Sequence, residues 1–392
     1  MTMKKNPRVA IIHYWLVNMR GGERVLERLI NLYPDADIFT HVYVPEAMSQ
    51  TIRSRPVKET FIAKLPGARK HYQKYLPLMP HALEHLDLRG YDLVISSESG
   101  PAKGVVTMPD ARHVCYVHSP MRYVWDHYHD YRDTAGRLAR MMMPVVSPWL
   151  RQWDESSAQR VDTLVANSSF IKRRIKRSWG LESSVVHPPV DSSLFHRSSD
   201  VQPFYLWVGQ MTSYKRADLA VDAFNKLGLP LVMVGTGEQG EKLRRKAGPN
   251  ITFHDHMDFD GLRRLYADAR ALVFTAEEDF GIVPVEAMAS GRPVIAFGKA
   301  GILDTVVPGQ TGLFFDEQTP EALIDAVERF DRWLPDFDPQ ASIDRALMFS
   351  PEIFDEGIRA AVDERSFDAL QVFESLHGRA SMRGPSPMRA LG

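Results

Sequence analysis

The feature that most limits the fold is an alternation of short apolar segments with amphipathic ones along nearly the whole chain. The apolar segments predict buried strands, and the segments between them repeat their apolar residues at helical spacing. This order is typical of parallel α/β sheets, in which helices cover both faces of the strands. We predict strands at residues 9–15, 38–42, 92–96, 114–117 and 163–166, and again at 204–208, 231–234, 251–254, 271–275 and 293–297.

The alternation is interrupted once, near residue 188. His187-Pro188-Pro189-Val190-Asp191 cannot continue a helix or a central strand, and a polar stretch follows it. A chain of 392 residues is also long enough for two domains. Ligands bind at the carboxyl ends of parallel strands, so we expect a ligand cleft between two doubly wound domains. We predict an N-terminal domain over 1–198, a second domain over 199–350, helices over 351–378 that pack back toward the first, and a flexible tail over 379–392.

Composition excludes several other classes of protein. Hydrophobic residues make up 44% of the chain and charged residues 25%, which excludes a disordered, collagen-like or coiled-coil protein. One cysteine excludes a disulfide scaffold and a zinc cage built on thiolates. The sequence shows neither an apolar run long enough to span a bilayer nor a signal peptide, so we expect a cytoplasmic protein.

Charge is divided unequally between the two halves. Residues 1–200 hold 28 Lys and Arg against 20 Asp and Glu, whereas residues 201–392 hold 20 against 29. The first half therefore either meets something anionic or simply has a different surface. Basic residues alternate with apolar and aromatic ones at 53–74 and 170–179, which suits docking on an anionic membrane surface as well as a solvated face.

Glu278 and Glu286 frame the segment with the strongest functional signal, Glu-Asp-Phe-Gly-Ile-Val-Pro-Val-Glu. It follows a predicted strand, and its proline suits the first turn of a helix. The backbone N–H groups of Gly281 and Ile282 would then lie at a helix N-terminus, which favours an anion such as a diphosphate. The two carboxylates can accept hydrogen bonds from the hydroxyls of a sugar-like ligand.

This segment resembles the E-x7-E signature of glycosyltransferase family four, whose members are retaining enzymes with the GT-B fold of two Rossmann-like domains. The resemblance covers nearly the whole chain. Its other motifs are Gly21-Gly22, Val-His-Ser-Pro at 117–120, Asn-Ser-Ser at 167–169 and a lysine at 215. In detail the chain is similar to the bacterial GDP-mannose-dependent α-mannosyltransferases of exopolysaccharide and O-antigen assembly, of the cellobiosyl-diphosphopolyprenol type.

The resemblance implies roles for residues of the second domain. Glu286 would bind the donor ribose and Glu278 the transferred sugar, while the amides of Gly281 and Ile282 would meet sugar and diphosphate. Lys215 would neutralise the leaving diphosphate. Many family members carry arginine where this chain has Gln210. Glutamine makes no charge-assisted phosphate contact, so either Arg216 compensates or Lys215 does more.

In the first domain, the resemblance places His118 beside the donor sugar, where its imidazole or backbone would contact a hydroxyl. Gly21 and Gly22 permit close approach of the backbone to a phosphate or an acceptor hydroxyl. Gly235-Thr236-Gly237, in the second domain, resembles a nucleotide-binding loop. Each of these features also has an ordinary structural interpretation: a single histidine is often packed in the core, and paired glycines often form a turn.

The resemblance implies transfer of mannose from GDP-mannose to a polyprenyl-diphosphate-linked oligosaccharide, with an α-linkage, without cofactor or metal, at the inner face of the plasma membrane. The Asp-x-Asp pairs at 35–37, 258–260 and 336–338 are interpreted as structural. The alternatives are UDP-glucose or UDP-N-acetylglucosamine as donor, an O-antigen or lipopolysaccharide acceptor, and a non-catalytic sugar-nucleotide-binding protein. A dinucleotide oxidoreductase lacks support because no Gly-x-Gly-x-x-Gly follows the first predicted strand. A nucleic-acid-binding protein lacks support because the sequence contains no recognised module for reading nucleic acid.

Overall fold

The computed structural model describes residues 6–378 and divides the chain into two compact units. Unit 1 contains the chain up to Pro189 together with Phe354–Phe367, and unit 2 contains Val190–Ile353 and the residues from Asp368. The predicted boundary at 198/199 is therefore too late. The segment after Pro189 belongs to unit 2 because the Val190 amide donates to the Phe349 carbonyl at 2.8 Å and its side chain is buried in that unit's core. The predicted tail, 379–392, lies outside the described residues.

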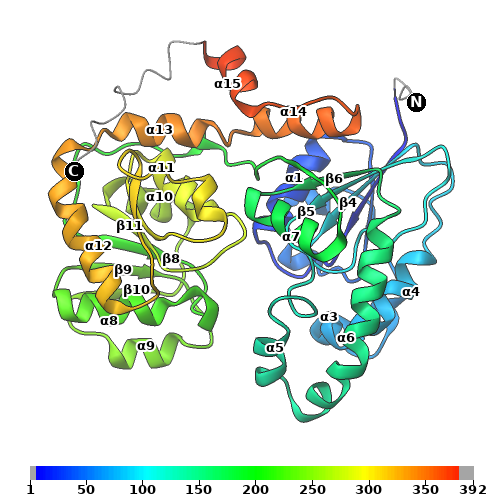
Figure 1. Cartoon of the computed structure of the whole chain (residues 1–392), viewed down its shortest axis with the longest axis horizontal. Helices are drawn as coiled ribbons and strands as arrows, with labels where there is room; N and C mark the ends of the chain where they lie inside the picture. The colour runs from blue at the N-terminus through cyan, green and yellow to red at the C-terminus, as the bar shows by residue number, and fades with distance from the viewer. Residues whose placement is uncertain (1–5, 379–392) are drawn as a thin grey trace. The chain divides into compact units, whose positions relative to one another are not determined.

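Unit 1 contains a seven-stranded parallel sheet in the order β3-β2-β1-β4-β5-β6-β7 (Figure 1). The strands β3 and β7 were not predicted, since both are very short edge strands with no buried residue. The strands are β1 (Val9–His13), β2 (Asp37–Thr40), β3 (Val57–Glu59), β4 (Leu93–Glu98), β5 (Arg112–Val117), β6 (Thr163–Ala166) and β7 (Ser184–Val185).

Helices cover both faces of this sheet because alternate strand residues point to opposite sides. Ile11 and Ile95 belong to the core beneath one set of helices, and Ile12 and Val94 to the core beneath the other. The first set is α1 (Gly21–Leu32), α2 (Gln50–Arg53) and α14 (Pro351–Val362). The second set is α4 (Met79–Glu84), α6 (Arg137–Ala158) and α7 (Ser169–Trp179).

Two helices differ from what their sequences favour. Proline usually breaks or kinks a helix, yet α6 runs unbroken through Pro144 and Pro148, because its later turns are packed on the sheet through Leu150 and Trp153. For 351–378 we predicted helices against the first domain. Helix α14 contributes Phe354 to the core of unit 1, but α15 (Ala369–His377) groups with unit 2.

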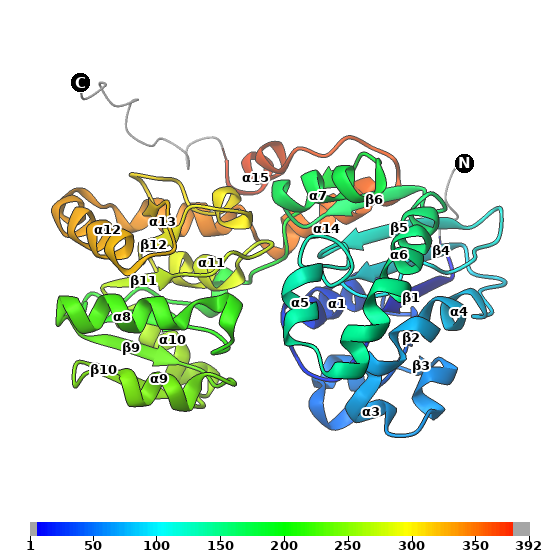
Figure 2. The ribbon, with the colours of Figure 1, turned by 60° about the horizontal axis from the view of Figure 1, so that its bottom comes forward.

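Unit 2 contains a six-stranded parallel sheet in the order β10-β9-β8-β11-β12-β13. The strands are β8 (Tyr205–Val208), β9 (Leu231–Val234), β10 (Ile251–His254), β11 (Ala271–Phe274), β12 (Val294–Phe297) and β13 (Gly312–Phe315). One face packs on α8 (Ala217–Leu227), α9 (Gly240–Lys246) and α12 (Pro320–Trp333). The other packs on α10 (Phe259–Asp268), α11 (Ile282–Ala289) and α13 (Pro339–Leu347) (Figure 2).

Both sheets have the doubly wound strand order of Rossmann-like domains, which confirms the predicted fold class. In each sheet the order reverses at one point, between β1 and β4 in unit 1 and between β8 and β11 in unit 2. Ligands of such sheets bind beyond the carboxyl ends of the strands at this reversal. The loops after these four strands are therefore where a site is expected in each unit.

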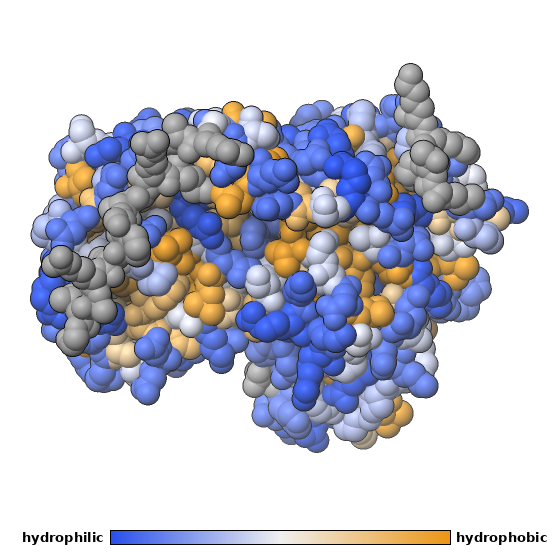
Figure 3. Space-filling model, turned by 45° about the horizontal axis from the view of Figure 1, so that its top comes forward, coloured by the Kyte–Doolittle hydropathy of each residue, from blue (hydrophilic) through white to orange (hydrophobic). Residues whose placement is uncertain are grey.

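Among residues 6–378, no helix combines the length and the apolar character that crossing a bilayer requires. The face drawn in Figure 3 mixes hydrophilic residues with several separate groups of hydrophobic ones.

Candidate functional site

The acidic loop that follows β11 is held in place by the loop that follows β12. The Gly301 amide donates to the Glu278 carbonyl at 2.9 Å, and Glu278 forms an isolated parallel bridge with Ala300. A Cβ atom at Gly301 would lie 2.2 Å from the Asp279 carbonyl oxygen, so only glycine fits at this position. The position of Glu278 is thus fixed by backbone contacts with a neighbouring loop.

The same loop leads directly into α11. Gly281 precedes the helix with φ of +92°, a conformation that L side chains rarely adopt. Ile282 is the first helical residue and Pro284 lies in the first turn. The structure therefore places the amides of Gly281 and Ile282 at the helix N-terminus, where the motif predicts them and where an anion is favoured.

Glu286, in α11, is almost fully buried, with 5% of its surface exposed. The hydroxyl of Tyr266, in α10, donates to its Oε2 atom at 2.8 Å. Because Tyr266 is itself completely buried, this contact fixes the orientation of the carboxylate. Sequence reasoning missed Tyr266, although a buried tyrosine hydroxyl normally requires a polar partner.

Lys215 and Glu278 form an ion pair at the reversal point of the unit 2 sheet, and each side chain is 19% exposed. The Thr275 hydroxyl donates to the Lys215 carbonyl at 2.8 Å and accepts from Trp207 Nε1 at 3.1 Å. These bonds tie the loop after β8 to the end of β11. A partly accessible cation therefore lies beside a carboxylate on the loop that leads to α11, a combination suited to a ligand that carries both phosphate and hydroxyl groups.

The structure does not bring Arg216 into this group. Its guanidinium contacts the Asp218 carboxylate, with Nε 3.2 Å from Oδ1, and the Gln318 side chain at 3.4 Å. Gln210 is exposed on the loop after β8. The contacts of Arg216 therefore give no support to the idea that it compensates for Gln210.

Gly235 and Gly237 have a packing role in the structure. A Cβ atom at Gly235 would lie 2.0 Å from the Gly209 carbonyl oxygen, and one at Gly237 would lie 2.5 Å from the Met211 carbonyl oxygen. The Met211 amide donates to the Thr236 carbonyl at 2.8 Å. These glycines allow the loop after β9 to pack tightly on the loop after β8.

In unit 1, Gly21 and Gly22 begin α1, directly beside the loop after β1. A Cβ atom at Gly22 would lie 2.3 Å from the Tyr14 hydroxyl and 3.7 Å from Nε2 of His118. The structure therefore brings Gly22 and His118, which the sequence singled out separately, to one place. Burial and the nearby His13 lower the pKa of His118 to about 3, so at neutral pH its imidazole is uncharged.

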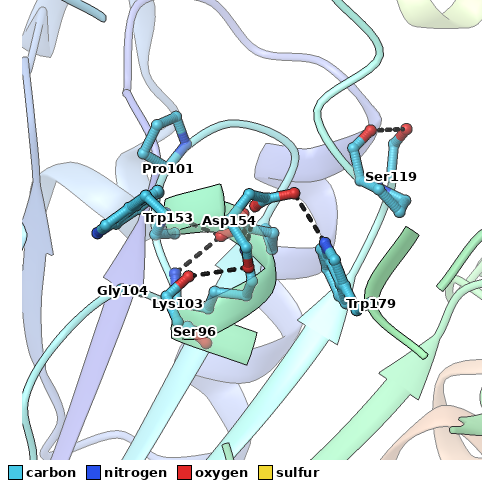
Figure 4. A network of polar contacts seen from close by, with 12 residues as sticks. Ser96, Pro101, Lys103, Gly104, Ser119, Trp153, Asp154 and Trp179 are labelled. Carbon is cyan, nitrogen blue, oxygen red and sulfur yellow. Dashed lines mark hydrogen bonds and ion pairs between the residues drawn. The ribbon is translucent and has the colours of Figure 1, made fainter. Parts of the chain in front are cut away.

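A buried charged network that the sequence did not reveal supports this end of the sheet (Figure 4). The fully buried Lys103 ammonium lies 3.1 Å from Glu98 Oε1 and also contacts Asp154. The indole N–H groups of Trp125 and Trp179 both donate to Asp154 at 2.7 Å. Burial raises the pKa of Glu98. Burial acts to lower the pKa of Lys103, but Asp154 and Glu98 together raise it to about 12.

The three Asp-x-Asp pairs have structural contacts. Asp37 contacts the Tyr91 hydroxyl and forms an ion pair with Lys58 at 3.2 Å. Asp258 caps α10 by accepting from the Gly261 amide at 2.7 Å, and Asp338 caps α13 in the same manner. Within residues 6–378, no group of three or more His, Cys, Asp or Glu side chains is arranged to hold a metal ion.

Comparison with known proteins matches each unit to a family model. Residues 19–194 match the model described as Glycosyltransferase Family 4, and residues 202–330 match that described as Glycosyl transferases group 1. The chain is 25% identical over 206 residues to the O-antigen chain mannosyltransferase RfbU of Salmonella typhimurium, which covers 46% of this chain and 57% of that protein. It is 27% identical over 216 residues to the D-rhamnosyltransferase WbpZ of Pseudomonas aeruginosa, covering 52% of this chain and 56% of that protein.

The chain spans about half the length of the curated relatives it matches. Among solved structures, it is similar to Anabaena HepE in complex with UDP and glucose, with a TM-score of 0.62 and 15% sequence identity. That similarity covers 96% of this chain and 100% of the other, and it concerns the fold. Residues 19–194 and 202–330 thus each match a glycosyltransferase model, and the two doubly wound sheets have the GT-B fold.

Proposed function

We propose that the protein is a retaining α-mannosyltransferase that moves mannose from GDP-mannose to a polyprenyl-diphosphate-linked oligosaccharide, cellobiosyl-diphosphopolyprenol in the narrowest form. The observation that supports a sugar-diphosphate donor most strongly is the arrangement of charged residues and backbone amides in unit 2. Lys215 and Glu278 form a pair on the loops at the reversal of the sheet, and the loop of Glu278 leads into the N-terminus of α11. The mannosyl donor is supported by the similarity to RfbU, which is named a mannosyltransferase.

Charge development explains why a cation is needed at this position. When the bond between the sugar C1 and the diphosphate oxygen breaks, the sugar becomes oxocarbenium-like and the diphosphate gains negative charge. Lys215 and the amides of Gly281 and Ile282 would stabilise that charge, and the backbone bonds of both loops hold them ready before the reaction. Glu286, oriented by Tyr266, would accept hydrogen bonds from the ribose hydroxyls.

The remaining steps require no covalent enzyme intermediate. The acceptor hydroxyl attacks C1 from the face that the diphosphate leaves, and the departing phosphate oxygen takes its proton. Glu278 would bind a hydroxyl of the transferred sugar while it keeps Lys215 in position. His118, which is uncharged at neutral pH, would contribute a hydrogen bond to a hydroxyl and no positive charge.

Two observations favour alternatives within the same reaction class. HepE is described in complex with UDP and glucose, which supports UDP-glucose as a second candidate donor. RfbU is named an O-antigen chain enzyme, which supports an O-antigen acceptor. A purely non-catalytic sugar-nucleotide-binding protein would show donor binding without turnover.

A donor screen tests the proposal. GDP-mannose, UDP-glucose and UDP-N-acetylglucosamine are each incubated with the protein and a lipid-linked cellobiose acceptor, with and without EDTA. We expect release of GDP and growth of the acceptor with GDP-mannose alone, at a rate that EDTA leaves unchanged. Transfer from a UDP-sugar would refute the donor assignment, and loss of activity in EDTA would refute the metal-free reaction.

We also propose that unit 1 docks on an anionic membrane, as a lipid-linked acceptor requires. Both predicted basic segments keep basic side chains exposed, although Arg174 is buried against Asp126. These exposed residues are Lys64, Lys70 and Lys74 in 53–74, and Lys172, Arg173, Lys176 and Arg177 in 170–179. Helix α6 adds a stripe that the sequence analysis did not single out. Four of its exposed apolar side chains recur at helical spacing, near the exposed Arg137 and Arg140: Met141, Met142, Val145 and Trp149.

Replacing Met141 and Val145 together by glutamate is expected to weaken binding to vesicles that contain anionic lipid by about tenfold or more, since both charges enter the apolar stripe. Vesicle co-sedimentation measures the effect. The control is Leu303→Glu, which places a charge at an exposed apolar residue of unit 2. Equal binding by both variants would show that α6 does not meet the membrane.

A further inference from the structure

A continuous chain of polar side chains lies behind His118. Its Nε2 atom is 2.9 Å from the Ser97 hydroxyl, which is 3.0 Å from Nδ1 of His13. Nε2 of His13 is 3.6 Å from Oε1 of Glu23. The ends of β1, β4 and β5 and the first turn of α1 supply these residues, and His13, Ser97 and Glu23 are all buried. None of the three belongs to the motifs of the family resemblance.

Glu23, at the far end of this series of polar side chains, determines which ring nitrogens of the histidines carry hydrogen. Glu23 occupies the first turn of α1, where the helix dipole favours a carboxylate, and its Oε2 accepts from the Arg20 amide at 2.9 Å. Its Oε1 faces Nε2 of His13, for which the structure shows no closer polar partner. A carboxylate attracts an N–H group and repels a nitrogen lone pair, so it favours the His13 tautomer with hydrogen on Nε2.

That tautomer fixes the direction of each following bond. With hydrogen on Nε2 and none on Nδ1, His13 has a lone pair on Nδ1, which accepts from the Ser97 hydroxyl. The Ser97 oxygen is then the acceptor for His118, whose Nε2 must carry the hydrogen. Nδ1 of the uncharged His118 ring is left with a free lone pair. The opposite order would set the Nε2 lone pair of His13 against the Glu23 carboxylate.

We propose that Glu23, His13 and Ser97 are positioning residues that hold His118 in its Nε2–H tautomer, so that Nδ1 is presented as a hydrogen-bond acceptor to a substrate hydroxyl. The assignment of a substrate hydroxyl as the partner of Nδ1 rests on the proposed glycosyl transfer. The assignment of the tautomer does not, because it follows from protein contacts alone. These three residues thereby make His118 selective for a group that donates a hydrogen bond, such as a sugar hydroxyl. A group that only accepts hydrogen bonds, such as a phosphate oxygen, is disfavoured.

The tautomer can be read by NMR of the protein with ¹⁵N-labelled histidine rings, without donor or acceptor. His13→Gln and His118→Gln spectra assign the two rings. In the wild-type protein we expect both rings to carry hydrogen on Nε2 and none on Nδ1. Ser97→Ala and Glu23→Gln should each turn the His118 signal into a mixture of tautomers. Hydrogen on Nδ1 of His118 in the wild type, a doubly protonated His13, or an unchanged signal in both variants would overturn the proposal.

Kinetics separate positioning from a merely structural role. Glu23→Gln is expected to lower kcat by about tenfold with little change in the KM for the donor, because it weakens one hydrogen bond that His118 makes in the reaction. The matched control is Glu27→Gln, one turn later in the same helix, which should leave kcat unchanged. An unchanged kcat in Glu23→Gln with an altered tautomer would refute the role of His118 as an acceptor and leave the glycosyl transfer itself intact.

Discussion

Replacement of Lys215 by alanine is expected to lower turnover of GDP-mannose by about 10²–10³-fold, the usual effect of removing one preorganised group that meets developing charge. Lys215 lies beside Glu278 and is tied to β11 through its carbonyl. Its removal leaves the departing diphosphate with the α11 amides alone. The expected loss is in kcat more than in KM, since the charge grows as the bond to the sugar breaks.

The fold should survive this substitution because the Lys215 side chain is partly exposed and outside both cores. Lys226→Ala is the matched control, since this lysine is also on unit 2 and paired with a carboxylate, Glu321, at 2.6 Å. It should keep the wild-type rate. Full activity in Lys215→Ala, with unchanged circular dichroism, would show that the leaving group is stabilised by other residues.

Replacement of Lys103 by methionine is expected to lower the free energy of unfolding by about 3–5 kcal/mol, as removal of one partner from a buried ion pair does. The ammonium is the cation that contacts both Glu98 and Asp154, and all three side chains are buried. Methionine has similar volume, so the loss reflects uncompensated charge more than a cavity. Urea unfolding at pH 7 measures the change, with the exposed Lys64→Met as control.

The deficit should also depend on pH. Burial raises the pKa of Glu98 in the folded state, so folding favours the protonated carboxyl. The free energy of unfolding therefore falls as the pH rises from the ordinary pKa of a glutamate through the raised one. Without Lys103 this effect grows, and the deficit should be smaller at pH 5 than at pH 7. A deficit below about 1 kcal/mol, or one that is the same at both pH values, would contradict the proposed energetics of the network.

Local patterns in the sequence were enough to predict the architecture. The ten predicted strands all occur, because a parallel strand buried on both faces is a continuous apolar run. The edge strands β3 and β7 were missed because they bury no side chain, and the edge strand β13 was missed although Gly312 and Phe315 are buried. The domain boundary was placed too late because 190–198 is polar in sequence yet packs on unit 2 through Val190 and Phe195.

The sequence predicted residues of the candidate site only where they lie close together in one continuous segment. The loop that begins at Glu278 and the start of α11 are contiguous, so the motif alone placed Gly281 at the beginning of a helix and Glu286 within it. In unit 2, Tyr266 reaches Glu286 from another helix, and in unit 1 the residues from Glu23 to Ser97 reach His118 from separate elements of that unit. Only the sheet topology brings those elements together, so no local pattern indicated their partners.

The most direct test of the proposed donor site is a crystal structure of the protein with GDP bound. The diphosphate is expected beside Lys215 and the amides of Gly281 and Ile282, with a ribose hydroxyl on Glu286. A nucleotide bound elsewhere, away from the loop at 278–286, would contradict the assignment of the donor site and the mechanism built on it.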